Sequence, residues 1–319
     1  MQRLPPSLRF LAVLAACSTL RAESPTDTLR VAIVQSGYPG SPRAAESFLK
    51  TLTAHLEAAT GFTGITATYD NVPAGALASL EKAPAAFGVV SLGFYLEHRH
   101  RLGLRALLET SPQEKFFVIA KKGGATSLAD LRQSSVAGGA LHEPRFVGWI
   151  VFPEAAVDEW KIEPTLRPSR ALRSLDRGEH RAVVLNSREY HSYEALGSLQ
   201  NTTTIAESKP FPVAVAVAFA EKPPASDEDA RGLDGAKTED DPPNPRAARL
   251  ATAFSELAAT KGGSELLATM GCREFRAVDR ERLEPIERLF DAHLPAPKES
   301  ARAENPPAAS SDAKRDDGR

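Results

Sequence analysis

The stretch from Phe116 to Gly139 reads FFVIAKKGGATSLADLRQSSVAGG and decides the fold class. It begins with an apolar strand at Phe116–Ala120, passes through a Gly-Gly turn, and continues into a short helix that Ser127 can cap. A second strand follows at Ser135–Gly139, and its closing glycines allow backbone to approach a ligand. Strand, turn, helix and strand in this order are typical of an α/β protein.

Helices and strands also alternate before this stretch. The patterns predict a strand at Leu29–Val34, a helix from Ser41 to Thr60, a strand at Ile65–Tyr69, a helix near Ala74 to Glu81, and a strand at Ala86–Val90. This alternation indicates a parallel sheet with right-handed crossovers.

The second half repeats the alternation. It predicts a helix from Pro144, a helix at Arg170–Arg177, a strand at Ala182–Leu185, a helix at Ser187–Leu196, and a strand at Thr203–Ala206. The run Val213–Phe219 is apolar throughout and belongs deep in a sheet. We interpret it as the return of the chain to its first half, so that two lobes share two connecting strands, Phe116–Ala120 and Val213–Phe219. Three helices then follow, at Arg246–Thr260, Gly263–Met270 and about Asp279–Ala292.

Four segments carry a resemblance to a known family. They are the opening strand to Tyr38, AFGVVSLGFY at Ala86–Tyr95, SLADL at Ser127–Leu131, and ALRSLDRGEHRAVV at Ala171–Val184. In this order and spacing they resemble the phosphonate-type periplasmic solute-binding proteins of ABC importers, which have the type 2 periplasmic-binding-protein fold. The resemblance covers about Leu29 to Leu289. It implies an α/β fold of two lobes, each a mainly parallel sheet flanked by helices, joined by two hinge strands.

The resemblance also implies a function. Such a protein is not an enzyme and uses no cofactor or metal; it captures a small polar or anionic solute between its lobes and presents it to a membrane permease. Two alternatives stay open, namely a solute-sensing component for a membrane signalling protein and an enzyme built on the same fold. Cys272 is a candidate nucleophile for the latter, but no acid or base lies at a local motif spacing around it.

One departure from the family concerns the ligand. In the family a Ser-Thr-Ser-Gly run at a helix start holds the phosphonate oxygens, whereas here Ala140–Gly148 reads ALHEPRFVG and contains no hydroxyl. Glu143 adds a negative charge at that place. Pro144 suits a first helical position, so the free amides of the helix can still attract an anion. We nevertheless expect phosphate and phosphonates to bind poorly.

Ligands of open α/β sheets lie at the carboxyl ends of the strands, so the loops there supply the candidate binding residues. Tyrosines offer stacking faces, serines and asparagine offer hydrogen bonds, and arginine can pair with an anion. Each candidate also has a structural interpretation: the loop residues can be solvated or packed against a neighbouring helix, the histidine can lie on the surface, and Arg145 can bond to Glu143. The candidates are Ser36, Tyr38, Ser91, Tyr95, His142, Arg145, Asn186 and Ser187.

The N-terminus indicates export. Arg3 and Arg9 precede the apolar stretch Phe10–Ala16, which is far shorter than the ~20 residues that a membrane span needs. We therefore expect a signal peptide at residues 1–22 and a location in the periplasm or cell envelope. The sequence LAAC ending at Cys17 resembles a lipobox, which implies lipidation of Cys17; cleavage near Ala22 is the alternative.

The remaining chain divides into lobes and polar segments. We expect residues 29–115 in the first lobe, 116–212 in the second and 213–292 back in the first. An acidic, Pro-rich insertion at 223–245 and a tail at 293–319 cannot bury enough apolar surface to order themselves. The net charge of −2 argues against nucleic-acid binding, and we expect a monomer.

Overall fold

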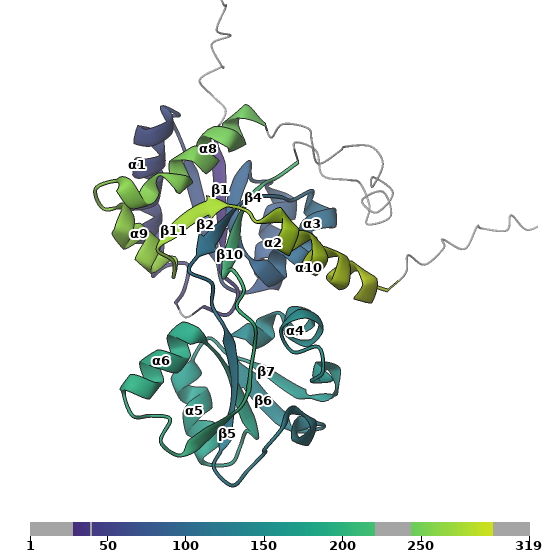
Figure 1. Cartoon of the computed structure of the whole chain (residues 1–319). Coiled ribbons are helices and arrows are strands. Elements are labelled where there is room, and N and C mark those ends of the chain that lie inside the picture. Colours follow the sequence, from purple (N-terminus) through teal and green to yellow (C-terminus); the bar gives the residue numbers. More distant parts are fainter. Residues whose placement is uncertain (1–27, 39, 221–243, 296–319) are drawn as a thin grey trace, which may run out of the picture.

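Two lobes, each built on one sheet, make up the computed structural model, which describes residues 28–38, 40–220 and 244–295 (Figure 1). The six-stranded sheet of the first lobe has the strand order β11-β4-β10-β3-β1-β2. The five-stranded sheet of the second lobe has the order β7-β6-β8-β5-β9. The predicted two-lobed α/β fold is confirmed.

Helices cover both faces of the first sheet. Buried side chains of α1, α8 and α9 pack on one face, and those of α2, α3 and α10 on the other. The strands are β1 (Arg30–Val34), β2 (Thr66–Asp70), β3 (Phe87–Ser91), β4 (Arg105–Ser111), β10 (Ala214–Ala218) and β11 (Glu274–Ala277). The helices are α1 (Glu46–Thr60), α2 (Pro73–Lys82), α3 (Leu92–Leu102), α8 (Pro245–Ser255), a 3-10 turn at Leu257–Ala259, α9 (Gly263–Thr269) and α10 (Arg280–His293).

The second lobe is smaller and richer in short helical turns. Its strands are β5 (Phe116–Lys121), β6 (Ser135–Gly138), β7 (Lys161–Pro164), β8 (Ala182–Asn186) and β9 (Thr202–Glu207). Its regular helices are α4 (Pro144–Phe146), which continues into a π-helical turn η3 (Val147–Val151), α5 (Pro168–Asp176) and α6 (Ser187–Ala195). Three 3-10 turns lie at Leu128–Leu131, Ala140–His142 and Val157–Glu159.

Both sheets are mixed rather than parallel throughout. β1 runs parallel to β2 and β3, and β6 runs parallel to β7 and β8. The strands that follow each passage between lobes, β5 and β10, run antiparallel to their neighbours. The parallel arrangement predicted from the alternating pattern therefore holds for one half of each sheet.

Three strands were not predicted: β4, β7 and β11. β7 and β11 are edge strands of four residues whose side chains are mostly exposed, and β4 alternates buried with partly exposed positions. Strands of this kind carry too few apolar residues to stand out in a sequence.

The chain passes between the lobes at residues 112–115 and 208–213. Glu114 and Phe211 pair there as an antiparallel bridge, with each amide donating to the other residue's carbonyl at 2.8 Å. β5 pairs only within the second sheet and β10 only within the first. The hinge thus lies in these two short segments, because neither strand is itself shared between the sheets.

Several expectations fall on residues outside those described. They are the signal peptide with Cys17, residues 223–243 of the acidic insertion, and residues 296–319 of the tail. Asn244 and Pro245 already belong to the start of α8, and His293 to the end of α10. Among the described helices, none is long and apolar enough to cross a lipid bilayer.

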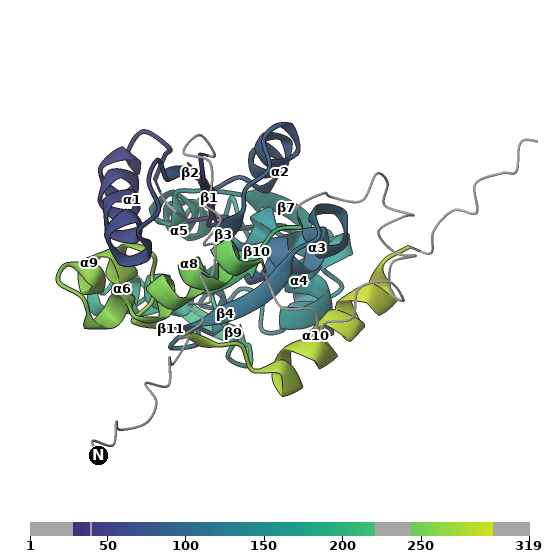
Figure 2. The same ribbon diagram turned by 90° about the horizontal axis from the view of Figure 1, so that it is seen from above.

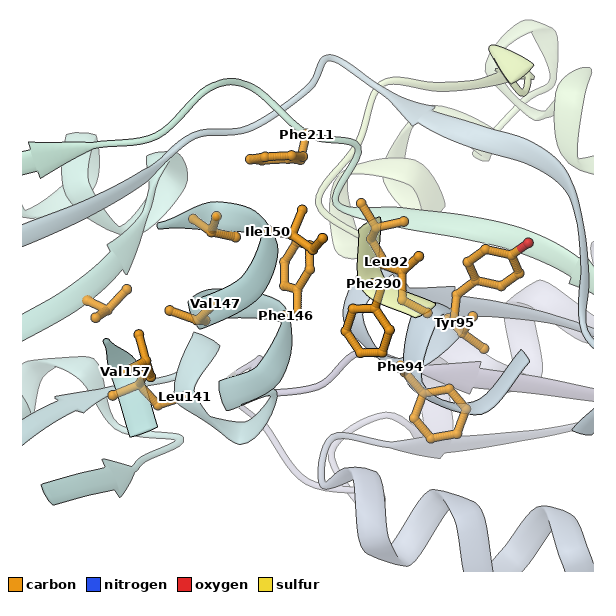
Figure 3. Close-up of a cluster of buried hydrophobic side chains, with 14 of the residues drawn as sticks. Leu92, Phe94, Tyr95, Leu141, Phe146, Val147, Ile150, Val157, Phe211 and Phe290 are labelled. Atoms are coloured by element: carbon orange, nitrogen blue, oxygen red, sulfur yellow. The ribbon is translucent and has the colours of Figure 1, made fainter. Parts of the chain in front are cut away.

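Seen from above, the helices sort into two groups (Figure 2): α1, α6 and α9 lie on one side of the molecule and α3, α4 and α10 on the other. On the second of these sides a single apolar cluster runs through both lobes. In Figure 3, Phe146 and Ile150 of the second lobe face Leu92 and Phe290 of the first. The Trp149 ring lies 5.0 Å from the Phe290 ring. The two lobes are therefore closed against each other along this side.

Candidate functional site

A small cavity lies between the lobes, at the carboxyl ends of β1, β3, β6 and β8. Its volume is about 40 Å³. Residues at or just after the ends of these strands line it, among them Ser36, Ser91, Glu143 and Asn186, and so do Glu114 and Phe211 of the two connecting segments. At about 10–15 Å³ per water, the cavity has room for only a few water molecules. It is a closed cleft that both lobes and both hinge segments enclose.

Two glycines allow the cleft to close. Gly37 has φ +76°, and a Cβ on it would overlap the carbonyl of Gly139 in the other lobe. A Cβ on Gly139 would in turn lie 2.6 Å from the Gly37 oxygen. The glycine that was expected to let backbone approach a ligand therefore lets the backbones of the two lobes approach each other.

Glu143 reaches from the second lobe to the N-terminus of α3 in the first. Its carboxyl group accepts hydrogen bonds from the Ser91 and Ser36 hydroxyls and from the Phe94 amide. A Cβ on Gly93 would overlap this carboxyl group, so the first turn of α3 must be open there. Free amides at a helix N-terminus form an anion-binding site, and here the chain's own side chain occupies it.

Burial raises the pKa of Glu143 to about 7, although the hydrogen bonds from Ser36, Ser91 and Phe94 act in the opposite direction. The side chain is only 7% exposed, so the cost of removing the charge from water outweighs those bonds. At neutral pH the group is therefore close to half protonated.

Two further carboxyl groups lie at the cleft, that of the buried Glu114 and that of the half-buried Glu189. Glu189 caps α6 together with Asn186: each accepts a hydrogen bond from the other's backbone amide, at 3.1 and 2.9 Å. Glu114 is 9% exposed, and no described residue donates a hydrogen bond to its side chain or forms an ion pair with it. Burial raises the pKa of both carboxyl groups to about 7. For Glu114, the positive charge of Arg188 lowers the pKa and the negative charge of Glu189 raises it.

A larger groove opens beside the cavity and shares Tyr38 and Asn186 with it. Its volume is about 510 Å³, within the range of small-molecule sites. Phe48 and Tyr69 of the first lobe and Arg188 of the second also line it. The Tyr38 hydroxyl is buried and has no hydrogen-bond partner among the described residues. Tyr38 and Asn186 thus separate a closed inner cavity from an open outer groove.

Four of the eight predicted site residues line the cavity: Ser36, Tyr38, Ser91 and Asn186. Tyr95 does not. It was placed in a loop, but α3 starts at Leu92 directly after β3 and leaves no loop there. Tyr95 is 3% exposed, and its hydroxyl donates to Glu287 of α10.

Arg145 and Ser187 also point elsewhere. Arg145 is exposed and pairs at 3.0 Å with Glu97 of the first lobe, rather than with Glu143 or the cavity. The Ser187 hydroxyl accepts from the Lys115 amide at 2.8 Å and donates to the Lys115 carbonyl at 3.1 Å. Both residues therefore hold the lobes or the hinge together, and neither lines the cavity.

His142 lies in the turn before α4 and does not line the cavity either. Its Nε2 atom is buried with no partner among the described residues, and burial lowers its pKa. Cys272 is 6% exposed, and burial raises the pKa of its thiol to about 12. A thiol that stays protonated at neutral pH is a poor nucleophile, which argues against Cys272 as a catalytic nucleophile.

The sequence interpretation missed Glu114, Phe116, Phe146 and Phe211. Glu114 and Phe211 lie in the hinge segments, and only the bridge between those segments brings them to the cavity. Phe116 and Phe146 look like ordinary core residues. The sequence indicated that the charge of Glu143 is an obstacle to an oxyanion. It could not indicate the bonds of Glu143 to Ser36 and Ser91, because these bonds cross from one lobe to the other.

The fold has clear relatives among solved structures, whereas no family model and no curated protein matches the chain. XAC2383 from Xanthomonas citri bound to chloride ion is 13% identical, with a TM-score of 0.61 over 83% of this chain and 98% of that one. A binding protein component of an ABC phosphonate transporter from Pseudomonas aeruginosa is 16% identical, with a TM-score of 0.57 over 85% and 91%.

PhnD1 from Prochlorococcus marinus in complex with methylphosphonate is 11% identical, with a TM-score of 0.57 over 83% of this chain and 97% of that one. At such identities the likeness establishes the fold. The chain has the two-lobed α/β fold of type 2 periplasmic binding proteins.

Proposed function

We propose that this protein is a non-catalytic solute-binding protein that encloses a small polar solute between its lobes and presents it to the membrane permease of an ABC importer. The observation that carries the proposal is the cavity between the lobes, which loops of both lobes and both hinge segments line. Closure of two domains around a ligand is the usual mechanism of proteins with this architecture.

The similar structures support a binding role. One is described as a component of an ABC phosphonate transporter, and another holds methylphosphonate. In this chain, however, the Glu143 carboxyl group occupies the N-terminus of α3, whose free amides would otherwise attract an anion, and three acidic side chains lie at the cleft. The proposal therefore takes the transport role from these relatives and not their ligand.

The proposed place of action is the periplasm or cell envelope. The basic and apolar N-terminus supports a signal peptide, and the LAAC sequence supports a lipid anchor at Cys17. Cys17→Ser should move the protein from membrane fractions to the soluble fraction. If the wild-type protein is already soluble, the anchor is excluded.

A sensing role is the second candidate, and the apolar contact between the lobes favours it. Phe290 is fully buried against the Trp149 ring, so apolar packing between the lobes contributes to holding them together. A transport protein must open to release its cargo, whereas a sensor domain can signal through smaller movements. Small-angle scattering with and without solute separates the two, since a contraction of the molecule favours transport.

Native mass spectrometry of protein purified without refolding tests the proposed function directly. We expect the folded chain to carry a small molecule that gentle denaturation releases, and its mass limits the identity of the solute. Protein that is free of any small molecule, and stays so after incubation with an extract of the producing cells, would contradict a solute-binding role.

A further inference from the structure

We propose that the inner cavity is a site for a primary ammonium group, paired with the Glu114 carboxylate and enclosed by the rings of Phe116, Phe146 and Phe211. The proposal rests on the proposed solute-binding function and names the chemical class of the solute.

Glu114 is the first reason. Glu114 lines the cavity and is nine-tenths buried, yet no described residue bonds to its carboxyl group. By contrast, Glu143 accepts three hydrogen bonds and Glu189 is held at the start of α6. A buried carboxyl group without a partner is costly, and a cationic hydrogen-bond donor removes that cost. Of these acidic residues, Glu114 is thus the one whose carboxyl group has no hydrogen-bond partner among the described residues.

The walls of the cavity are the second reason. The Phe116 and Phe146 rings have centroids 5.9 Å apart at an interplanar angle of 79°, and the Phe146 and Phe211 rings have the same separation at 76°. The faces of aromatic rings are electron-rich and attract a cation. None of the described residues that line the cavity is a lysine, arginine or histidine. A cation therefore meets no positively charged side chain among these residues.

The dimensions suggest how such a solute lies. A cavity of about 40 Å³ accommodates an ammonium group but not a whole metabolite. The outer groove of about 510 Å³ begins at Tyr38 and Asn186, which both spaces share. The unpartnered Tyr38 hydroxyl stands at this boundary, where it can hydrogen-bond the solute. We infer a flexible solute with its amine in the cavity and its body in the groove.

Binding should depend on pH, because a cation pairs with Glu114 only when the acid is ionised. The charged or titratable groups that face Glu114 are Arg188 and Glu189 of α6, Tyr38, and Cys272; Glu143 lines the same cavity. Burial raises the pKa of Glu114 to about 7. Affinity for an ammonium ligand should therefore increase from about pH 6 to about pH 8.

Titration calorimetry with simple probes tests the proposal. The probes are ethylammonium and 1,4-diaminobutane, with ethanol as the neutral control and acetate and methylphosphonate as the anionic controls. Glu114→Gln keeps the size of the side chain and removes its charge; Glu154→Gln, at an exposed position, is the matched control. A second variant, Phe211→Leu, removes one ring and keeps the apolar volume approximately. Melting curves establish that each variant is folded.

We expect the ammonium probes to bind the wild-type protein and Glu154→Gln equally. Glu114→Gln should lose at least about tenfold in affinity, as is typical of charge-assisted bonds, and Phe211→Leu several-fold. Tighter binding of acetate or methylphosphonate than of ethylammonium, or equal ammonium binding by Glu114→Gln, would overturn the ammonium site and leave the solute-binding function standing. If no probe binds and native mass spectrometry finds no solute, both proposals fail.

Discussion

The cleft between the two lobes has two unlike sides. On one side, α3 and α10 pack against α4 and η3 through apolar side chains, with Phe290 fully buried. On the other side, the loop after β1 and the start of α1 face α6 across an open groove lined by tyrosines, Arg188 and Glu189. The apolar side resembles the core of a single domain, and the groove side resembles a ligand site.

This difference indicates how the molecule can open. Separating the apolar side would expose buried apolar surface at a cost of roughly 25 cal/mol per Å². The groove side is already open. The lobes should therefore pivot about the apolar side, and a solute should enter through the groove past Tyr38 and Asn186. Between these sides, Glu143 bonds to Ser36 and Ser91, and Gly37 closely approaches Gly139. These contacts determine how far the cleft closes.

The largest expected effect tests the apolar side. Phe290→Ala should lower the free energy of unfolding by about 3–5 kcal/mol, because it leaves a cavity in the packing between the lobes. Leu289→Ala on the same helix changes a side chain that is 44% exposed and should cost less than about 0.5 kcal/mol. Urea denaturation measures both. Equal losses would show that the contact between α10 and the second lobe contributes no more than a surface position.

The next effect concerns the Glu143 contact and its pH dependence. Burial raises its pKa to about 7 from 4.5, so between these values the folded protein retains a proton that the unfolded chain has lost. Stability should consequently fall as pH rises through this window, by up to about 1.4 kcal/mol per pKa unit, or about 3 kcal/mol in all. Glu114 and Glu189 add to the trend in the same direction.

Glu143→Gln should abolish the Glu143 part of this trend. The amide keeps the size and one acceptor, so the variant should be more stable than the wild type at about pH 8 and similar to it at about pH 5. Melting temperatures across this range measure the difference, with exposed Glu154→Gln as the control. A variant that is less stable at every pH would mean that the ionised carboxylate stabilises the closed cleft.

A smaller effect distinguishes the stability cost of a left-handed backbone conformation from the cost of a steric clash between the lobes. Gly37 and Gly64 have nearly the same φ, +76° and +75°, but only at Gly37 would a Cβ meet the opposite lobe. Both alanine variants incur the left-handed backbone cost of about 1–2 kcal/mol. Gly37→Ala should lose about 1–2 kcal/mol more and have a larger radius of gyration. If the two variants match in both measurements, the contact between Gly37 and Gly139 does not limit closure.

The smallest expected effect is an absence of binding. Phosphate, phosphite and methylphosphonate should leave the melting temperature unchanged, whereas a ligand at a hundredfold excess over its Kd stabilises by ~2.7 kcal/mol. Glu143→Ser vacates the N-terminus of α3 and adds a hydroxyl, so this variant should gain a shift with these anions. A clear shift in the wild-type protein would show that the anions displace Glu143.

Much of the fold followed from the sequence because it depends on local patterns. The apolar strands β1, β3, β5, β8 and β10 and the helices α1, α2, α5 and α6 were predicted, whereas α3, which follows β3 directly, was not. The carboxyl ends of β1, β3 and β8 also supplied four residues that line the cavity, because in such sheets the carboxyl ends of the strands gather at one edge. Tyr95 was misplaced by less than one helical turn, which was enough to bury it under α10.

The sequence by itself therefore determined the α/β class, the order of most elements and the edge at which the site lies. Periodicity and chain direction are properties of neighbouring residues, so a linear pattern contains them. Only the tertiary structure decided what fills the cleft. Glu143 meets Ser91 across 52 residues of sequence, and Glu114 meets Phe211 at the second passage of the chain. Such contacts and the pKa values that follow from them depend on how two lobes close, which no local pattern specifies.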